Sequence, residues 1–396
     1  MNTKSIISET DEYYLPVFTR YQLAFTHGKG CKLYDADGDE YLDFLAGIAV
    51  NSLGHAHPAV VKAISEQAGK LMHCSNIYYT DVQARAVKLI SEATGFDRVF
   101  LANSGAEGNE GAIKLARKYG HSKNDGKYRI ITATHSFHGR TMMTVTATGQ
   151  PKYQQGYEPL PAGFDYVPYG DIAALTDAMD EDVCCVMLEP IQGEGGVHVP
   201  ADEYLQQARA LCDKYDALLI FDEIQTGVAR TGAWFAYMHS GVKPDILTFA
   251  KGIGGGFPVG GFCVDEKLAH VFKPGDHGGT FGGNALACSA IEAVLTVIKE
   301  EKIVEQVAEK GQYFKEKLFE LKAKYPEKIA EVRGRGLILG MELTKPGAPL
   351  VAHCLSNHVI INCTAGNVIR LVPPLIVTKQ EIDTALAAIE AALAEF

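Results

Sequence analysis

A lysine and an acidic pair each follow an apolar run that is typical of a buried strand. Lys251 comes directly after residues 245–250 and before a glycine-rich stretch, and Asp222 and Glu223 follow residues 217–221. Open α/β sheets bind ligands just outside the carboxyl ends of their strands, and glycines there let the backbone approach a ligand. An amine and a carboxylate at two strand ends suit a lysine that binds pyridoxal phosphate (PLP) covalently and an acid that pairs with its pyridinium nitrogen. A structural ion pair beside a turn stays open as the alternative.

A second stretch, residues 103–110, favours an anion. Ser104 and Gly105 lie between the strand-like run 98–102 and a helical pattern, so they fall near the amino terminus of a helix. Free N–H groups and the helix dipole favour an anion such as a phosphate at that place. Ser104 followed three residues later by Glu107 fits an ordinary helix N-cap equally well.

The segments that carry these residues alternate between helix and strand patterns from about residue 57 to residue 283. Such alternation predicts a mainly parallel sheet with helices on both faces. The expected helices are 57–71, 81–93, 107–119 and 201–215, and the expected strands are 98–102, 128–133, 183–188, 217–221, 246–250 and 259–264. After Asn284 the expected elements are amphipathic helices to about residue 325, strands within 331–343 and 368–372, and a closing helix from about residue 379.

These patterns predict an α/β fold with three parts. Residues 53–283 would form a large domain around the mainly parallel sheet, and residues 284–396 a smaller α+β domain at the carboxyl end. Residues 1–52 have the pattern of an irregular arm with short strands at 32–35 and 40–44. We expect this arm to pack with the small domain.

Size, charge and cysteine content narrow the classes of function. The chain has 396 residues and a formal net charge of −11, so nucleic acids and anionic membranes are not expected as partners. No apolar run is long enough to span a bilayer, and residues 1–10 lack the apolar core of a signal peptide, so we expect a cytoplasmic protein. The nine cysteines include no Cys-x-x-Cys pair, and His55 and His57 have no matching acidic or cysteine spacing, so no metal is expected.

Six motifs spread along the chain resemble, in type and order, those of the class III PLP-dependent aminotransferases. Each motif alone is weak evidence, whereas their agreement in order is strong, and the resemblance covers nearly the whole chain. It implies the PLP-dependent transferase fold type I, and within the class the sequence is most similar to the acetylornithine aminotransferases. The motifs are residues 103–110, 136–140, 189–196, 221–227, 251–258 and 279–284.

The resemblance implies roles for four residues around the cofactor ring. Lys251 would be the Schiff-base lysine, and it would also move a proton between the substrate carbon and C4′ of the cofactor. Asp222 would keep the pyridine nitrogen protonated, so that the ring acts as an electron sink. Gln225 would hydrogen-bond the ring hydroxyl and Phe137 would stack on the ring face, with a loop amide and an ordinary core residue as the alternatives.

The resemblance also implies where the cofactor phosphate binds. Ser104, Gly105 and Ala106 would hold it, joined by Thr280 from the neighbouring subunit. This last contact implies a homodimer with shared active sites. Many relatives carry a threonine at the position of Ala106, so one hydroxyl contact to the phosphate is expected to be missing.

Two arginines are expected to bind the carboxylates of the substrates, an amino donor and 2-oxoglutarate. Arg140 resembles the clamp for the far carboxylate of either substrate. Arg370 resembles the second clamp, and Glu194 matches the acid that masks it in ω-aminotransferases. A donor that reacts through a terminal amine has no carboxylate next to the reacting carbon, so Glu194 would neutralise Arg370 and swing aside for 2-oxoglutarate. Unrelated surface charges stay open as the alternative for this pair.

The expected donor depends on Ile48, within residues 47–50. Ornithine aminotransferases place a tyrosine near this position for the free α-ammonium group, and the apolar residue here resembles the acetylornithine enzymes. An ammonium facing Ile48 would lose hydration without compensation, so an acylated α-amine is expected. The implied reaction converts N2-acetylornithine and 2-oxoglutarate into N-acetylglutamate 5-semialdehyde and glutamate, as in arginine biosynthesis.

Other functions stay open. The donor could be N-succinylornithine, 4-aminobutyrate or another ω-amino compound. An aminomutase would need no keto-acid acceptor. A non-enzymatic sensor would usually lose the lysine or carry a DNA-binding extension, and neither is seen, so this alternative is disfavoured.

Overall fold

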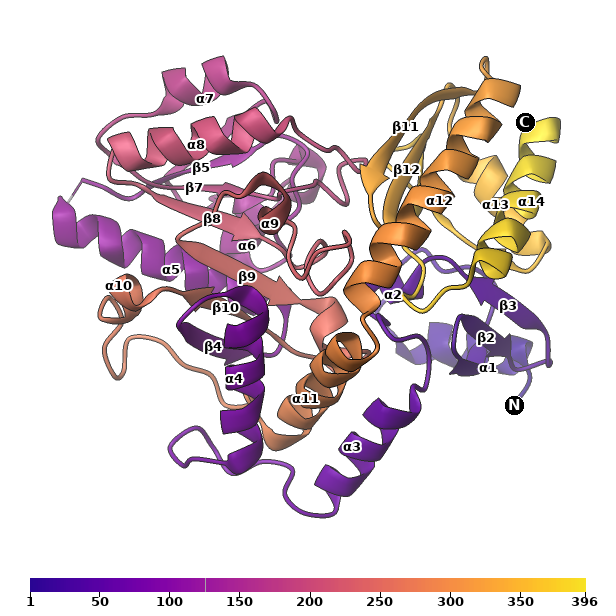
Figure 1. Cartoon of the computed structure of the whole chain (residues 1–396), viewed down its shortest axis with the longest axis horizontal. Coiled ribbons are helices and arrows are strands. Elements are labelled where there is room, and N and C mark those ends of the chain that lie inside the picture. The colour runs from indigo at the N-terminus through magenta and orange to yellow at the C-terminus, as the bar shows by residue number, and fades with distance from the viewer. Residues whose placement is uncertain (125) are drawn as a thin grey trace.

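The site lies on a seven-stranded sheet in the computed structural model, which describes residues 1–124 and 126–396 (Figure 1). The strand order is β4-β10-β9-β8-β7-β5-β6. The bounds are β4 (Arg98–Ala102), β5 (Arg129–Ala133), β6 (Phe164–Val167), β7 (Val183–Leu188), β8 (Leu218–Asp222), β9 (Ile246–Ala250) and β10 (Gly260–Val264). β10 runs antiparallel to both its neighbours, and the other pairs of strands are parallel. The prediction of a mainly parallel sheet is confirmed.

The central strands explain why this sheet could be recognised. β7, β8, β9 and β10 are buried along their whole length. Strands covered by helices on both faces have continuous apolar sequences rather than alternating ones. The predicted bounds of 183–188 and 246–250 therefore agree with the structure. β6 was not predicted, because this edge strand is mostly only half-buried and its sequence has no apolar run.

Helices cover the sheet and brace its edges (Figure 1). α8 connects the parallel strands β7 and β8, α5 packs against β9 and β10, and α11 packs against α3 and α4. The helices are α3 (Pro58–Ala68), α4 (Asp81–Thr94), α5 (Gly105–Lys123), α6 (Met142–Ala147), α7 (Ile172–Ala178), α8 (Asp202–Lys214), α9 (Tyr237–Ser240), α10 (Glu266–Ala269) and α11 (Ala285–Glu300), with 3₁₀ turns η1 (Pro151–Tyr153) and η2 (Lys251–Gly254).

The amino-terminal segment forms a small sheet that a strand from the far end of the chain completes. Its order is β1-β2-β3-β13, with β1 (Phe25–Lys29), β2 (Lys32–Asp35), β3 (Glu40–Asp43) and β13 (Val359–Ile360). The element α2 (Ala46–Ala49), a left-handed turn, follows β3. The expectation of an irregular arm is wrong for α1 (Thr3–Tyr13), which is a helix capped by Asn2. This helix buries none of its residues, and its only aliphatic side chains, Ile6 and Ile7, are too few to mark it as a helix in the sequence.

The carboxyl-terminal part has its own sheet, with the order β11-β12-β15-β14. Helices α12 and α14 contact each other on it, and the amphipathic pattern of both was visible in the sequence. The bounds are α12 (Ile303–Lys324), β11 (Ile329–Arg335), β12 (Ile338–Leu343), α13 (Ala348–Ser356), β14 (Asn362–Thr364), β15 (Val368–Leu371) and α14 (Lys379–Glu395). The domain limits at residues 52 and 283 stay a prediction.

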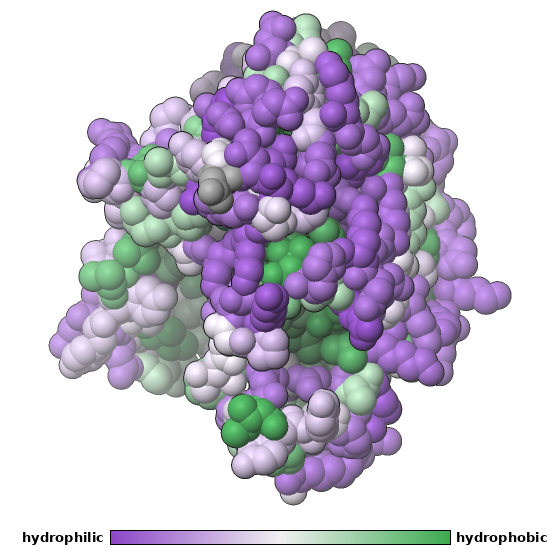
Figure 2. All heavy atoms as spheres, turned by 90° about the vertical axis from the view of Figure 1, so that its left-hand side faces the viewer, coloured by the Kyte–Doolittle hydropathy of each residue, from purple (hydrophilic) through white to green (hydrophobic). Residues whose placement is uncertain are grey.

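The surface is mixed in character. The face turned toward the viewer in Figure 2 is mainly hydrophilic, with hydrophobic atoms in smaller groups. Within the residues that the structure describes, no helix combines the length and the apolar character needed to cross a bilayer.

Candidate active site

The carboxyl ends of β8 and β9 open onto a cavity of about 440 Å³. These strands are parallel neighbours, and Asp222 ends one of them while Lys251 directly follows the other. The predicted site residues that line the cavity are Ser104, Gly105, Ala106, Phe137, Arg140, Glu194, Asp222, Gln225 and Lys251. Among the described residues, Ile48, Thr280 and Arg370 were also predicted for the site and lie outside this lining.

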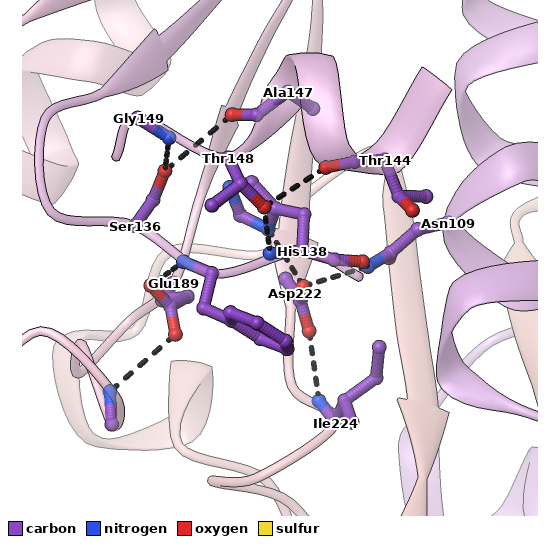
Figure 3. A network of polar contacts seen from close by, with 12 residues as sticks. Asn109, Ser136, His138, Thr144, Ala147, Thr148, Gly149, Glu189, Asp222 and Ile224 are labelled. Carbon is purple, nitrogen blue, oxygen red and sulfur yellow. Dashed lines mark hydrogen bonds and ion pairs between the residues drawn. The ribbon is translucent and has the colours of Figure 1, made fainter. Parts of the chain in front are cut away.

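Asp222 is held in place by three donors (Figure 3). Its Oδ2 accepts a hydrogen bond from Nδ2 of Asn109 at 2.8 Å and lies 2.7 Å from Nδ1 of His138. Its Oδ1 accepts from the N–H of Ile224 at 3.1 Å. The carboxylate is therefore fixed in one orientation at the edge of the cavity. Neither Asn109 nor His138 can be recognised as a partner from the sequence, because both lie far from Asp222 in the chain.

The second acid of the pair, Glu223, points the other way. Its side chain is buried and accepts hydrogen bonds from the N–H groups of Ala236 at 2.6 Å and Tyr237 at 2.7 Å, and from Oγ1 of Thr226 at 2.9 Å. Burial raises the pKa of Glu223 to about 7. Because successive side chains of a strand alternate, Asp222 faces the cavity and Glu223 anchors a loop behind it.

Glu189, which follows β7, joins two loops of the site (Figure 3). Its Oε2 accepts a hydrogen bond from the N–H of Phe137 at 3.2 Å, and its Oε1 accepts one from the N–H of Gly193 at 3.4 Å. Burial, together with the charge of Asp222, raises the pKa of Glu189 well above its usual range. The carboxyl group lines the cavity and orients the loop that carries the aromatic ring of Phe137.

The start of α5 combines a cap with an anion site. Oγ of Ser104 accepts a hydrogen bond from the N–H of Glu107 at 3.2 Å. The side chain of Ser104 is therefore an N-cap, as one of the two interpretations of this motif predicted. Gly105 and Ala106 occupy the first two positions of the helix and line the cavity. N–H groups at these positions have no acceptor within the helix, which leaves them available to an anion. A Cβ at Gly105 would lie 2.6 Å from Cδ1 of Ile224, so any side chain there would require Ile224 to move.

Lys251 opens the turn η2 with a positive φ of 49°. A non-glycine residue in this region of φ is uncommon and marks a position that the surroundings enforce. Burial lowers the pKa of Lys251, and the nearby charge of Arg370 adds to this effect, while Glu194 and Asp222 oppose it. A lowered pKa favours the neutral amine, which is the nucleophilic form.

Arg370, in β15, is fully buried and forms an ion pair with Glu194. Its Nη1 also donates to Oε1 of Gln225 at 3.2 Å, and its Nε donates to Oδ1 of Asn362 at 3.3 Å. Burial raises the pKa of Glu194, but the positive charges of Arg370 and Lys251 outweigh it, so the pKa is lowered overall. Glu194 and Gln225 thus connect the buried arginine to the cavity that they line.

Arg140 is exposed at the cavity and stacks on aromatic rings, and it pairs with no acid among the residues that the structure describes. Its Cζ lies 3.9 Å from the ring centroid of Tyr153 and 5.4 Å from that of Phe137. Such cation–π contacts orient a guanidinium while leaving its N–H groups available to a ligand. Tyr153 has no signal in the sequence motifs, because only its contact with Arg140 connects it to the site.

Ile48 lies in a left-handed turn. Ala46, Gly47, Ile48 and Ala49 all have positive φ, between 50° and 66°. This conformation costs roughly 1–2 kcal/mol for each residue other than glycine, so surrounding contacts must enforce it. Ile48 is 40% exposed, and Val50 lines the cavity directly after the turn.

Thr280 is exposed and lies in the loop before α11. Its neighbour Phe281 is 59% exposed. The predicted contact of Thr280 with a cofactor in a neighbouring subunit stays a prediction.

Comparisons with known proteins place this geometry in a family. The model of the class-III aminotransferases matches residues 16–393. The chain belongs to the class-III aminotransferases. It is 51% identical to the acetylornithine aminotransferase of Caldanaerobacter subterraneus subsp. tengcongensis over 392 residues, which cover 98% of this chain and 99% of that protein.

Two solved structures of aminotransferases are similar over the whole chain. The ornithine aminotransferase of Toxoplasma gondii has a TM-score of 0.95 and 35% identity and is matched over 100% of this chain and 96% of its own. The acetylornithine aminotransferase of Elizabethkingia anophelis has a TM-score of 0.89 and 34% identity, with 100% of both chains covered. The fold is that of the PLP-dependent transferases of fold type I, as the sequence predicted.

The cofactor of this class-III aminotransferase is PLP, and the residues of the cavity fit it. The start of α5 offers the N–H groups of Gly105 and Ala106 to a phosphate. Asp222 offers a fixed carboxylate to a ring nitrogen, and Lys251 offers an amine. These three groups match the phosphate, the ring nitrogen and the aldehyde of PLP.

Replacing Lys251 with methionine is expected to stabilise the PLP-free protein. Because burial lowers the pKa of Lys251 in the folded state, the unfolded chain binds the proton more tightly, and folding is penalised at any pH below the ordinary value of 10.5. The penalty is full below the folded pKa and vanishes as the pH rises through 10.5. The advantage of Lys251→Met in urea unfolding should therefore shrink between pH 7 and pH 10.5. An advantage that does not change with pH would contradict the lowered pKa.

Proposed function

We propose that this class-III aminotransferase transfers the δ-amino group of N2-acetylornithine to 2-oxoglutarate, which gives N-acetylglutamate 5-semialdehyde and glutamate, as in arginine biosynthesis. The observation that carries the proposal is the buried ion pair of Arg370 and Glu194 beside Lys251. An arginine masked by an acid suits an enzyme whose donor has no carboxylate next to the reacting carbon and whose acceptor does. The 51% sequence identity to a protein named acetylornithine aminotransferase supports N2-acetylornithine as the donor.

Lys251 and Asp222 divide the chemistry of this reaction. PLP, when bound, supplies an electron-withdrawing ring that takes up the electron pair left on the substrate carbon. Asp222, held by its three donors, pairs with the protonated ring nitrogen. Nζ of Lys251, whose pKa is lowered by burial, removes the proton from the carbon that bears the reacting amine and later returns a proton.

Arg370 alternates between two partners in the proposed cycle. With the donor bound, it stays paired with Glu194, because a buried charge left without its partner is destabilising by about 3–5 kcal/mol. With 2-oxoglutarate bound, the α-carboxylate of the acceptor replaces Glu194. Arg140, which has no acidic partner among the described residues, binds the far carboxylate of either substrate.

The proposed preference for an acylated donor rests on the turn that carries Ile48. This side chain offers no hydrogen-bond acceptor to a free ammonium group, whereas a neutral acylamino group loses less on leaving water. Val50, the residue that lines the cavity just after the turn, is equally apolar. The wall on this side of the cavity therefore disfavours free ornithine.

A homodimer with shared active sites is part of the proposal. An exposed apolar patch supports it: Leu71, Met72, Ile77, Tyr78, Tyr79 and Phe281, of which Tyr79 is 102% exposed. Asn76 ties the two segments of this patch together through its hydrogen bond to the carbonyl of Gly282 at 2.7 Å. Contiguous apolar surface of this kind marks protein interfaces, and Thr280 lies beside it.

We place the reaction in the cytoplasm. The nine cysteines of the chain are unpaired, and seven of them are buried. Reduced cysteines that pack as small apolar residues are typical of a reducing compartment.

A donor panel tests the proposed function. Protein loaded with PLP is mixed separately with N2-acetylornithine, N-succinylornithine, ornithine and 4-aminobutyrate, and the visible absorbance of the bound cofactor is followed. Fast loss with N2-acetylornithine, reversed by 2-oxoglutarate, is the expected result. Faster loss with another donor would overturn the assigned donor, and turnover without any keto acid would indicate an aminomutase.

Arg140→Ala is expected to weaken both half-reactions. A charge-assisted hydrogen bond is worth about 1.5–3 kcal/mol, so KM for both N2-acetylornithine and 2-oxoglutarate should rise roughly 10- to 100-fold. Arg140→Lys, which keeps the charge but not the planar fork, serves as the matched control and should lose less. Steady-state kinetics with each substrate varied in turn measures the effect. A rise for only one substrate would show that the clamp is not shared.

A further inference from the structure

One buried acid, Asp43, holds the entry of the left-handed turn Ala46–Ala49. Asp43 is 1% exposed, and its Oδ1 accepts hydrogen bonds from the N–H groups of Leu45 and Ala46, both at 2.8 Å. Its Oδ2 lies 2.7 Å from Nε2 of His55, which follows the turn. A single carboxylate therefore connects the two segments between which the turn lies.

The same turn is tied to both sides of the site. Oγ of Ser52 donates to the carbonyl oxygen of Gly252 at 2.7 Å, and Gly252 directly follows the reactive lysine. On the other side, the N–H of Val372 donates to the carbonyl oxygen of Phe44 at 2.9 Å, just beyond the strand of the second arginine. The position of the turn is thus fixed relative to the groups that perform the proposed reaction.

The turn needs these contacts because its own sequence does not favour it. Three of its four residues are not glycine, and Ile48, which is β-branched, is among the residues least suited to a positive φ. Residues in such conformations keep them only where the surroundings enforce them. Asp43 provides this enforcement at the point where the backbone enters the turn.

We propose that Asp43 and His55 are positioning residues that set the affinity for the acylated end of the amino donor. They hold the left-handed turn so that Val50, which lines the cavity, and Ile48, which lies just outside the lining, present an apolar wall to the acylamino group. Glutamate and 2-oxoglutarate have no acylamino group to place against this wall. The inference rests on the proposed function and adds to it the residues that maintain donor recognition.

The first test uses Asp43→Ala in the PLP-loaded enzyme. KM for N2-acetylornithine should rise about tenfold, because two hydrogen bonds that hold the turn are lost. The half-reaction with glutamate, followed by the visible absorbance of the bound cofactor, should be unchanged. Asp43→Asn keeps an oxygen that accepts from both N–H groups and should lose less. Equal losses with both amino substrates would overturn the proposal, because they would indicate a general structural role.

A glycine rescue tests the mechanism itself. Ala49 has a φ of 61°, a conformation that glycine adopts without strain, so Ala49→Gly should reduce the need for Asp43. The double variant Asp43→Ala/Ala49→Gly should recover part of the affinity for N2-acetylornithine. Ala63→Gly, in the ordinary helix α3, is the matched control and should recover nothing. Recovery with the control, or none with Ala49→Gly, would overturn the proposal.

Failure of the proposed function would look different. If the wild-type enzyme reacts with glutamate but not with N2-acetylornithine, the assigned donor is wrong. KM of the Asp43 and Ala49 variants is then measured for the donor in the panel that the wild type accepts. A variant that leaves KM for that donor unchanged overturns the positioning role, and a selective rise with glycine rescue supports it. Thermal unfolding of each variant verifies that the fold is retained.

Discussion

Lys251→Ala is expected to abolish turnover while the fold is retained. The variant lacks both the amine that binds PLP covalently and the group that moves the proton at the substrate carbon. Loss of a proton-transfer group alone lowers the rate roughly 10²- to 10⁴-fold, so the overall loss should be at least this large. The measurement is single-turnover loss of the visible absorbance with N2-acetylornithine, together with steady-state glutamate formation.

Two further variants distinguish the amine from its charge. Lys251→Arg keeps a positive charge but has no nucleophilic amine, because a guanidinium is not deprotonated in proteins. It should be as inactive as Lys251→Ala. A small primary amine added to Lys251→Ala should restore part of the rate, because it can enter the space that the side chain left. Normal turnover in Lys251→Ala would refute the assignment of this lysine.

Asp222→Asn is expected to lower kcat roughly 10²- to 10³-fold, the usual effect of removing one group that stabilises developing charge in a buried site. An amide has no negative charge, so it cannot stabilise the protonated form of the ring nitrogen as the carboxylate does. Whichever way the amide is turned, its NH₂ group would face a donor that now points at the carboxylate, either Asn109 or the N–H of Ile224. The single-turnover rate constants of both half-reactions should fall together, because the cofactor ring takes part in both.

Glu223→Gln is the matched control for this variant. The two acids are neighbours in the chain, but Glu223 faces the loop at Ala236 and Tyr237 and does not line the cavity, within the described residues. We therefore expect a lower melting temperature with little change in kcat. Equal losses of kcat in both variants would indicate that Asp222 acts through the fold and not through the cofactor.

The large sheet, and the positions of Lys251 and Asp222 at the ends of its strands, were predictable because the sequence patterns that indicate them are local. Buried parallel strands have continuous apolar runs, and an amine or acid at the end of such a run is easily noticed. The positions of Lys251 and Asp222 at neighbouring strand ends follow from the strand order, which the alternation of elements constrains but does not determine. The roles of these two residues came from their types and from the resemblance to a family.

The rest of the site depends on contacts between residues that are distant in the chain. Asn109 reaches Asp222 across 113 positions, and Glu194 reaches Arg370 across 176. Periodicity and composition contain no information on such pairs, so Asn109 was missed and the second pair was expected only through the resemblance. Helix α1 was missed for a different reason: it buries no residue, and its only aliphatic side chains are Ile6 and Ile7.

The pairing of β3 with β13 has a consequence for how the chain acquires its donor-recognition turn during synthesis. Leu42 pairs with Val359, roughly 300 residues further on. At about 5–20 residues per second, the ribosome needs on the order of 15–60 seconds to add them. Until then, the amino-terminal sheet lacks its edge strand, and the contact between Phe44 and Val372 cannot form. The first part of this enzyme to be made is thus among the last to reach its final structure.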